Sequence, residues 1–252
     1  AKLSLILALA KYFHDRKWSG LYRLRDLWLP ALFTLIPVGL IIKQPDLGTG
    51  MVLLLIFLVM ALVAGLRPRS ILILALVGVV ALPGGWFSLK DYQKERILTL
   101  FNPEADPLGA GYHSLQSKIA IGSGGLWGKG LFAGTQSRLN FLPEKHTDFI
   151  FAVFSEQMGF IGAGVLLLLY LALLFRACDL AIKSSDKMST LIATGVTVMI
   201  AFYIVFNIGM TLGLFPVVGI PLPLMSYGGS AMLTFMIGIG LLLNIRMRRF
   251  LY

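Results

Sequence analysis

Charged residues are scarce in this 252-residue chain. They make up 13% of it, against 57% hydrophobic residues, whereas a soluble domain carries roughly 25% charged residues. A chain this apolar is expected to lie in a lipid bilayer. Acidic residues are scarcer than basic ones, 12 against 22, which gives a formal net charge of +10. In an apolar protein this excess is typical of loops held at the cytoplasmic membrane surface.

Several motifs are also missing, and each absence argues against a class of function. Cys178 is the single cysteine, so no internal disulfide can form. HExxH, paired cysteines and GxSxG do not occur, which leaves a zinc protease or a serine hydrolase without support. The chain also lacks the zinc spacings and stacking motifs of a soluble basic domain, so nucleic acid is not expected as a partner.

Long uncharged stretches predict an all-α polytopic membrane protein, since a helix needs about 20 mostly apolar residues to cross about 30 Å of hydrocarbon. Four such stretches are 27–42, 47–66, 70–89 and 157–175. A fifth, 188–245, is too long for one helix. Its prolines, at Pro216, Pro221 and Pro223, predict two spans joined by a turn. With 3–10 as the end of a partial span, six complete transmembrane helices are expected.

Lys and Arg residues in the connections set the expected orientation, because they resist translocation. Alternate connections carry them: Lys11, Arg16, Lys17, Arg23, Arg25, Arg67, Arg69, Arg176, Lys183, Lys187, Arg246, Arg248 and Arg249. We place this basic set and the C-terminus in the cytoplasm. The opposite side then holds Lys43, the segment 213–226 and the segment 90–148. The last is expected to be a large extracytoplasmic loop within one membrane domain, 1–252.

The loop 90–148 is long for a connection between membrane helices, and long connections usually have a function. Aromatic residues occur along it, at Tyr92, Phe101, Tyr112, Trp127, Phe132 and Phe141. This composition favours short interfacial helices or re-entrant pieces over a disordered tether. The functional site is therefore expected in this loop.

The loop ends in the segment PEKHTDFIF, 143–151, at the start of the next span. Asp148 lies there where water meets hydrocarbon, and partial desolvation would make its carboxylate a better general base. Thr147 and Asp148 are also good N-terminal residues for a helix, so capping is an equally supported interpretation from residue type alone. His146 would either orient a substrate hydroxyl or simply be solvated.

Two ionisable residues lie inside apolar runs. Glu156 follows Asp148 by eight residues, and a charge at the centre of a span costs about 2.5 to 3.5 kcal/mol by insertion scales, which marks a functional candidate. The favoured structural alternative is a hydrogen bond to a polar group on a neighbouring helix, such as Asn207 or Asn244. Lys2 would similarly bind an anionic head group or extend to the membrane surface.

Glycines cluster between Gly122 and Gly130, with Lys118 and Lys129 nearby. Such a run can present backbone N–H groups to a phosphate. It does not match the P-loop pattern GxxxxGK[ST]. Tight turns between amphipathic pieces are the favoured interpretation.

Five segments together resemble the SEDS family (shape, elongation, division and sporulation proteins: RodA, FtsW and SpoVE). They are QPDLGT at 44–49, NPEADPLGAGYH at 102–113, QSKIAIGSGGLWGKG at 116–130, GTQSRLNFLPEKHTDFIF at 134–151 and PVVGIPLPLMSYGGS at 216–230. Their order and spacing cover most of the chain. The sequences of these segments are most similar to those of the rod-shape branch, RodA.

This resemblance implies a peptidoglycan glycosyltransferase of the bacterial inner membrane that serves cell elongation. It would polymerise lipid II, release polyprenyl pyrophosphate, contact membrane lipid and work beside a class B penicillin-binding transpeptidase. The family has roughly ten spans with a large loop before the eighth. The chain begins in mid-pattern at Ala1 without an initiator Met or a signal peptide, so about three spans are expected to precede it.

The resemblance also implies site residues. The family's catalytic aspartate corresponds to Asp148 and its membrane lysine to Lys2. Further substrate-binding candidates match positions shared across the family: Gln116, Ser117, His146 and Thr147. Asp46 matches the family's QPD turn, whereas Asn140 departs from it, because many relatives carry Glu there.

The implied reaction is inverting and needs a single carboxylate, because pyrophosphate leaves as a stable anion and requires no general acid. Asp148 would be the general base, and Lys2, with Lys118 or Lys129, would stabilise the pyrophosphate. The sequence identifies no cofactor and leaves open whether Mg²⁺ or Mn²⁺ assists. Two alternatives stay open: a lipid II flippase, which Glu156 and the helix breakers would suit, and a non-catalytic scaffold for the transpeptidase.

Overall fold

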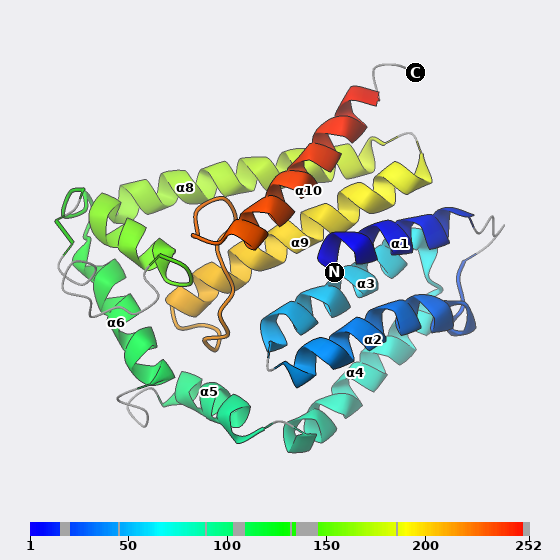
Figure 1. Ribbon diagram of the computed structural model, residues 1–252, viewed down its shortest axis with the longest axis horizontal. Helices are drawn as coiled ribbons and strands as arrows, with labels where there is room; N and C mark the ends of the chain where they lie inside the picture. The colour runs from blue at the N-terminus through cyan, green and yellow to red at the C-terminus, as the bar shows by residue number, and fades with distance from the viewer. Residues whose placement is uncertain are drawn as a thin grey trace. The chain divides into compact units, whose positions relative to one another are not determined.

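The computed structural model describes residues 1–15, 21–44, 46–88, 90–102, 109–131, 133–134, 146–184 and 186–248. In these ranges the regular structure is helical, with one isolated β-bridge between Tyr22 and Leu66. The helices are α1 (Lys2–Asp15), η1 (Leu24–Leu27), α2 (Trp28–Lys43), α3 (Leu47–Gly65), α4 (Pro68–Ser88), α5 (Asp91–Phe101), α6 (Ala110–Ser123), α8 (Ile150–Ile182), α9 (Lys187–Thr211) and α10 (Gly229–Arg248) (Figure 1). The all-α prediction is confirmed.

Among the described residues, five helices are long and apolar enough to cross a membrane. They are Leu24–Lys43, which joins η1 to α2, and then α3, α8, α9 and α10. Helix α4 has 21 residues, and its apolar part is Pro68–Val80. These helices occupy the places of the six predicted spans, and α1 occupies that of the partial one. The protein is therefore a multi-pass membrane protein, as predicted.

One predicted span begins too late. The uncharged stretch starts at 157, yet α8 begins at Ile150 and runs for 33 residues to Ile182. The predicted span was limited to the run without charge, and Glu156 ends that run on its N-terminal side. Glu156 is fully buried inside the protein, so its charge does not mark the end of the helix.

The chain forms two compact units. Unit 1 consists of Ala1–Ser88, Leu174–Phe202 and Leu233–Tyr252, and unit 2 of Leu89–Leu173 and Tyr203–Met232. Unit 1 contains most of the apolar helices, whereas unit 2 contains the described part of the predicted loop. The short helices expected in that loop are present as α5 and α6.

Close helix packing forms the core of unit 1, where α2 and α1 both pack against α3. Helix α9 approaches the same core at Gly195. A Cβ there would lie 2.8 Å from Ile6 and 2.9 Å from Met60. Lipid tails are as apolar as the helices, so no hydrophobic effect drives helices together in a bilayer. Close van der Waals packing at small residues is therefore a main source of stability between membrane helices.

Three connections meet at one end of unit 1, which we call the basic-loop junction (Tyr22, Leu66 and Lys187). The amide of Tyr22 donates to Gly65 at 2.8 Å, and its carbonyl accepts from Arg67 at 3.1 Å. The ammonium of Lys187 lies 5.1 Å from the centre of the Tyr22 ring. Connections that precede α2, α4 and α9 therefore lie at the same end, in agreement with their prediction as one basic set.

Candidate functional site

The segment His146–Phe149 forms a turn immediately before α8. His146 is exposed, Thr147 and Asp148 are half-buried, and Phe149 is buried. The Phe149 side chain packs with Ala120 of α6 and with Val217. This apolar contact anchors the buried end of the turn, while the preceding polar residues stay partly or fully exposed.

Three successive carbonyl groups of this turn are hydrogen-bonded, an arrangement that we call the carbonyl clamp (Asn207, Ser226 and Tyr227). The Nδ2 of Asn207 donates to the Asp148 carbonyl at 2.8 Å. The Oγ of Ser226 donates to the Thr147 carbonyl at 2.5 Å. The amide of Tyr227 donates to the carbonyl of His146 at 2.8 Å.

The clamp is itself fixed within unit 2. Asn207 is fully buried on α9, and its Nδ2 also donates to the Ile220 carbonyl at 2.6 Å. Ser226 Oγ accepts from the Leu222 amide at 2.7 Å. Helix α9 and the connection 212–228 are thereby joined to the turn that carries Asp148. Sequence reasoning missed this role, although Asn207 is one of the two asparagines in the uncharged stretch 188–245 and was a signal for it.

The Asp148 carboxylate lies against the backbone of that connection. A Cβ at Gly219 would lie 3.4 Å from Asp148 Oδ2, and Gly219 has a φ of 73°. A side chain at 219 would be strained by this left-handed conformation and would press on the carboxylate. Glycine is therefore the residue that fits beside Asp148.

Helix α6 supplies three of the predicted substrate-binding residues. Gln116 is half-buried and Lys118 is exposed. Ser117 is fully buried, and its Oγ donates to the Thr211 carbonyl at the end of α9 at 2.7 Å. The end of the Lys118 side chain lies over Gly213, where a Cβ would overlap it. Ser117 thus joins α6 to α9, and Lys118 remains accessible beside that helix end.

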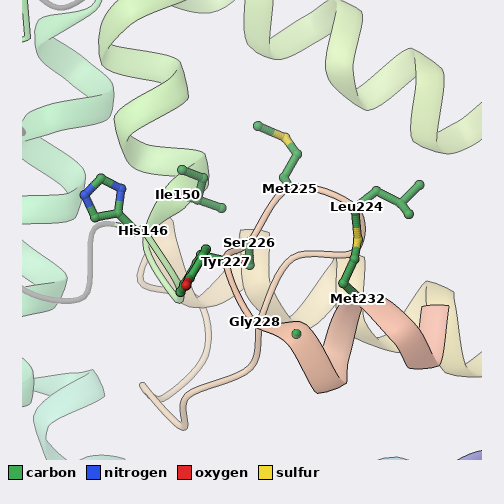
Figure 2. Close-up of a pocket in the computed structure, with 9 residues that line it drawn as sticks. His146, Ile150, Leu224, Met225, Ser226, Tyr227, Gly228 and Met232 are labelled. Atoms are coloured by element: carbon green, nitrogen blue, oxygen red, sulfur yellow. The ribbon is translucent and has the colours of Figure 1, made fainter. Parts of the chain in front are cut away.

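A pocket of about 590 Å³ lies beside the turn. Its lining comes from the turn, from the start of α8 and α10, and from the connection between α9 and α10; it includes His146, Ile150, Leu224, Ser226, Tyr227 and Met232. Figure 2 shows His146 on the left and Leu224 and Met232 on the right. Asp148 does not line the pocket, but its sequence neighbours His146 and Ile150 do.

Helix α8 is broken one turn past Glu156. Gly159 has a φ of 67° inside the helix, which interrupts the ladder of hydrogen bonds. The amides of Phe160 and Ile161 would otherwise donate to the carbonyls of Glu156 and Gln157. Groups released in this way must find other partners, because the surrounding lipid offers none.

The glycine-rich segment 122–130 satisfies these four groups. The amides of Lys129 and Gly130 donate to the released carbonyls at 3.0 Å each. The carbonyls of Gly125 and Leu126 accept from the released amides at 2.8 and 3.2 Å. The segment forms turns, as the favoured interpretation predicted, and these two amides bond to the protein rather than facing a phosphate.

Glu156 forms an ion pair with this segment. Its Oε1 lies 3.0 Å from Lys129 Nζ, and the Lys129 side chain is 28% exposed. The favoured expectation of a bond to Asn207 or Asn244 was wrong, because it considered only polar residues on other spans. Lys129, one of the two lysines predicted as alternatives at the pyrophosphate, therefore has a buried carboxylate as its partner in this structure.

The other two predicted site residues lie in unit 1. Asp46 begins α3, where its carboxylate accepts from the Thr49 amide at 2.9 Å. It acts there as a helix cap. Lys2 is half-buried at the start of α1. Asn140 lies outside the described residues, as do Arg16, Lys17 and Arg249.

These features define a class: a polytopic membrane protein that presents a clamped acidic turn at the end of its apolar helices. The chain belongs to the FtsW, RodA and SpoVE family, because the model of this family, described as "Cell cycle protein", matches residues 1–250. The family expected from the sequence motifs is thereby confirmed.

Two curated relatives illustrate the family. Peptidoglycan glycosyltransferase MrdB of Escherichia coli (strain K12) is 45% identical over 250 residues, which cover 99% of this chain and 67% of that protein. Stage V sporulation protein E of Bacillus subtilis (strain 168) is 41% identical over 245 residues, which cover 97% of this chain and 66% of that protein. The chain spans about two thirds of the length of these relatives.

Solved structures agree with this assignment. The crystal structure of the Thermus thermophilus rod shape determining protein RodA matches with a TM-score of 0.65 and 36% identity, over 98% of this chain and 64% of that one. A structure described as "Structural coordination of polymerization and crosslinking by a peptidoglycan synthase complex" matches with a TM-score of 0.77 and 38% identity. That match covers 98% of this chain and 68% of the other.

Proposed function

We infer that the chain belongs to a peptidoglycan glycosyltransferase that polymerises lipid II into glycan strands for cell elongation and rod shape. Relatives that are named for this activity are up to 45% identical to it. The observation that carries the proposal is the clamped turn, because its three fixed carbonyls hold the backbone beneath Asp148. The family's catalytic aspartate corresponds to this residue.

In the proposed reaction, the Asp148 carboxylate takes the proton of the 4-hydroxyl of an acceptor sugar. The resulting oxygen nucleophile attacks the anomeric carbon of the donor. The bond from that carbon to the pyrophosphate oxygen breaks with inversion, and polyprenyl pyrophosphate leaves with the electron pair. A leaving group of this kind is a stable anion, so one carboxylate suffices where a glycosidase needs two.

The clamp has a defined task in this mechanism. Fixed placement of a catalytic group removes much of the entropic cost of reaching the transition state. Three hydrogen bonds to the turn and the packing of Phe149 provide that placement. We propose that Asn207 and Ser226 act as positioning residues for Asp148.

The remaining candidates divide by location. In unit 2, exposed His146 and half-buried Gln116 would contact substrate, and Lys118 would stabilise the pyrophosphate. Thr147 and Ser117 would act through their backbone and side-chain bonds, which hold the turn and α6 in place. In unit 1, we propose a head-group contact for Lys2 and a turn-forming contribution for Asp46.

The proposed setting is the bacterial inner membrane. The C-terminus would be cytoplasmic and the loop 90–148 extracytoplasmic, as the distribution of basic residues indicates. A class B penicillin-binding transpeptidase is the proposed partner. The similarity to a peptidoglycan synthase complex supports such an assembly.

Polymer formation in detergent separates this proposal from its two alternatives. The complete protein, purified and supplied with labelled lipid II, is expected to produce glycan strands that gel electrophoresis resolves. A flippase would produce no polymer, because a detergent solution has no second compartment. A scaffold would need an added polymerase. The main feature that suited a transporter, Glu156, is accounted for by its ion pair with Lys129.

A further inference from the structure

Unit 2 contains a second pocket, of about 450 Å³, apart from the one beside His146. Its walls come from the end of α6, the glycine-rich segment, the kinked part of α8 and the end of α9. The lining includes Ile121, Phe151, Ser155, Ala163, Leu167 and Ile208. Apart from Ser155, these side chains are apolar, so the pocket suits a hydrocarbon.

The pocket is lined by α6 and α8, and it lies further along α8 from the turn that carries Asp148. Along the α8 segment, Phe151 and Ser155 follow Asp148 at helical spacings, which places Ser155 about 10 Å from the level of Asp148. On α6, Ile121 follows Lys118 by three residues and therefore lies on the same side of the helix. Both walls change from polar at the turn to apolar in the pocket.

The pocket also reaches the outer surface of unit 2. Phe160 lines it and is 73% exposed. Leu168 and Leu171 lie further along α8 and are 66% and 61% exposed. In a membrane this face of α8 meets lipid, so a chain can enter the pocket directly from the bilayer.

One polar atom in the pocket lacks a partner. The Oγ of Ser155 is buried without a hydrogen bond among the described residues, and the residue is 2% exposed. Leaving a buried hydroxyl unpaired costs about 1–3 kcal/mol. The C=C bonds of a prenyl chain offer this hydroxyl a weak acceptor of the O–H···π kind, which a saturated acyl chain does not.

We propose that this pocket binds the prenyl chain of the lipid-linked substrate, next to its pyrophosphate. The inference rests on the proposed function, which places the sugar of that substrate at Asp148. An amphiphile whose polar end occupies the turn has its tail at the level of the pocket. Along α6 and α8, polar side chains near the turn are followed by apolar ones in the pocket. Such a substrate likewise has a polar sugar and pyrophosphate followed by an apolar prenyl chain.

Filling the pocket tests the proposal. Gly164 lines it, and a Cβ there would meet nothing within 4 Å, so Gly164→Leu adds volume without a backbone clash. Gly39→Leu is the matched control, because Gly39 has equally open surroundings on α2. In the complete protein, Gly164→Leu is expected to raise KM for long-chain lipid II about tenfold, the usual effect of misfit in an apolar pocket. KM for an analogue with a short prenyl chain should change less than about twofold.

The comparison of chain lengths makes the result decisive. An unchanged KM for long-chain lipid II, or an equal rise for both substrates, would overturn the proposal. If the wild type polymerised neither substrate, the proposed function would fail instead, which is a separate outcome. Ser155→Ala removes the hydroxyl without filling space and is expected to raise KM for the long chain about twofold, by loss of a weak contact.

Labelling provides a test that does not depend on a variant folding. A substrate analogue with a photoreactive prenyl chain should label the peptide containing Phe151–Leu167 in the wild-type protein, and unlabelled lipid II should suppress the label. Labelling confined to other helices would contradict the proposal. A photoreactive phospholipid that labelled the same peptide and was not displaced by lipid II would assign the pocket to bilayer lipid and would also overturn it.

Discussion

The two units each bring three segments together, but with different chemistry. In unit 1 the basic-loop junction is held by main-chain pairing at Tyr22 and by Lys187 over its ring. In unit 2 the carbonyl clamp uses side chains, and Asn207 and Ser226 bind carbonyls of the turn. The first arrangement joins connections. The second fixes the backbone of the turn that carries Asp148, the proposed general base.

The contrast predicts where substitutions will matter. In unit 2, loss of one buried group should have larger effects, because it takes a partner from a buried carboxylate or from a carbonyl of the turn. In unit 1, loss of a partner at an exposed residue of a connection, such as Asp186 before α9, should affect stability slightly and activity hardly at all.

The largest expected effect is at the buried ion pair. Lys129→Met leaves the fully buried Glu156 carboxylate without its cation, which should destabilise the complete protein by about 3–5 kcal/mol. The double variant Lys129→Met with Glu156→Leu removes both charges and should recover most of that loss. Thermal unfolding in detergent measures both changes. A double variant as unstable as the single one would contradict a purely structural role for the pair.

The next effect concerns the clamp. Asn207→Ala removes the donor to the carbonyls of Asp148 and Ile220. A displaced catalytic group can cost about 100-fold in rate, so kcat for glycan polymerisation should fall by that order while KM changes little. Asn244→Ala is the matched control, because Asn244 is exposed on α10. Equal kcat values for the two variants would contradict the proposal that the carbonyl clamp positions Asp148.

The smallest effect is expected in unit 1, at the connection before α9. The Asp186 carboxylate accepts from the Ser189 amide at 2.9 Å, and Asp186→Ala should cost about 1 kcal/mol, the usual value for a lost helix cap. Polymerisation should stay within about twofold of wild type, because the hydrogen bonds of Asp186 are to Ser189 and Thr190 at the start of α9. A large loss of activity would break the contrast between the units.

Acid should remove this stabilising contribution. Burial raises the pKa of Asp186, whereas hydrogen bonds from Ser189 and the charge of His14 lower it. The lowering effects are larger together, so the pKa of Asp186 lies below the ordinary value of 3.8. A lowered pKa stabilises the folded protein above that ordinary value, and the stabilisation is lost as pH falls through the folded pKa. The stability difference between wild type and Asp186→Ala should therefore shrink below pH 3.8. Thermal unfolding at several pH values checks this.

The fold was largely predictable from the sequence, because the bilayer imposes a minimum length on each span. Runs without charge located α2, α3, α4, α9 and α10, and the prolines after 213 located the connection between the last two. The start of α8 was missed for one physical reason. A charge is costly in lipid, but Glu156 lies inside the protein beside Lys129, where the cost is offset.

The site was predictable only in part. The family motif pointed to Asp148, and the glycine pattern indicated turns. The clamp was not predictable, because Asn207 is separated from the turn by 59 residues and nothing in its neighbours shows which carbonyl it binds. The exchange of backbone bonds between the kink at Gly159 and the segment 122–130 is likewise a tertiary feature that no local pattern contains.

The central claim is that the Asp148 carboxylate is the base that activates the acceptor hydroxyl. The most direct measurement is the rate of glycan polymerisation from lipid II by the complete, purified protein carrying Asp148→Asn. Asp91→Asn provides the matched control, since it makes the same change at an exposed position on α5. We predict that Asp148→Asn unfolds at the wild-type temperature yet forms no polymer, whereas Asp91→Asn polymerises normally. Normal polymerisation by Asp148→Asn would contradict the account.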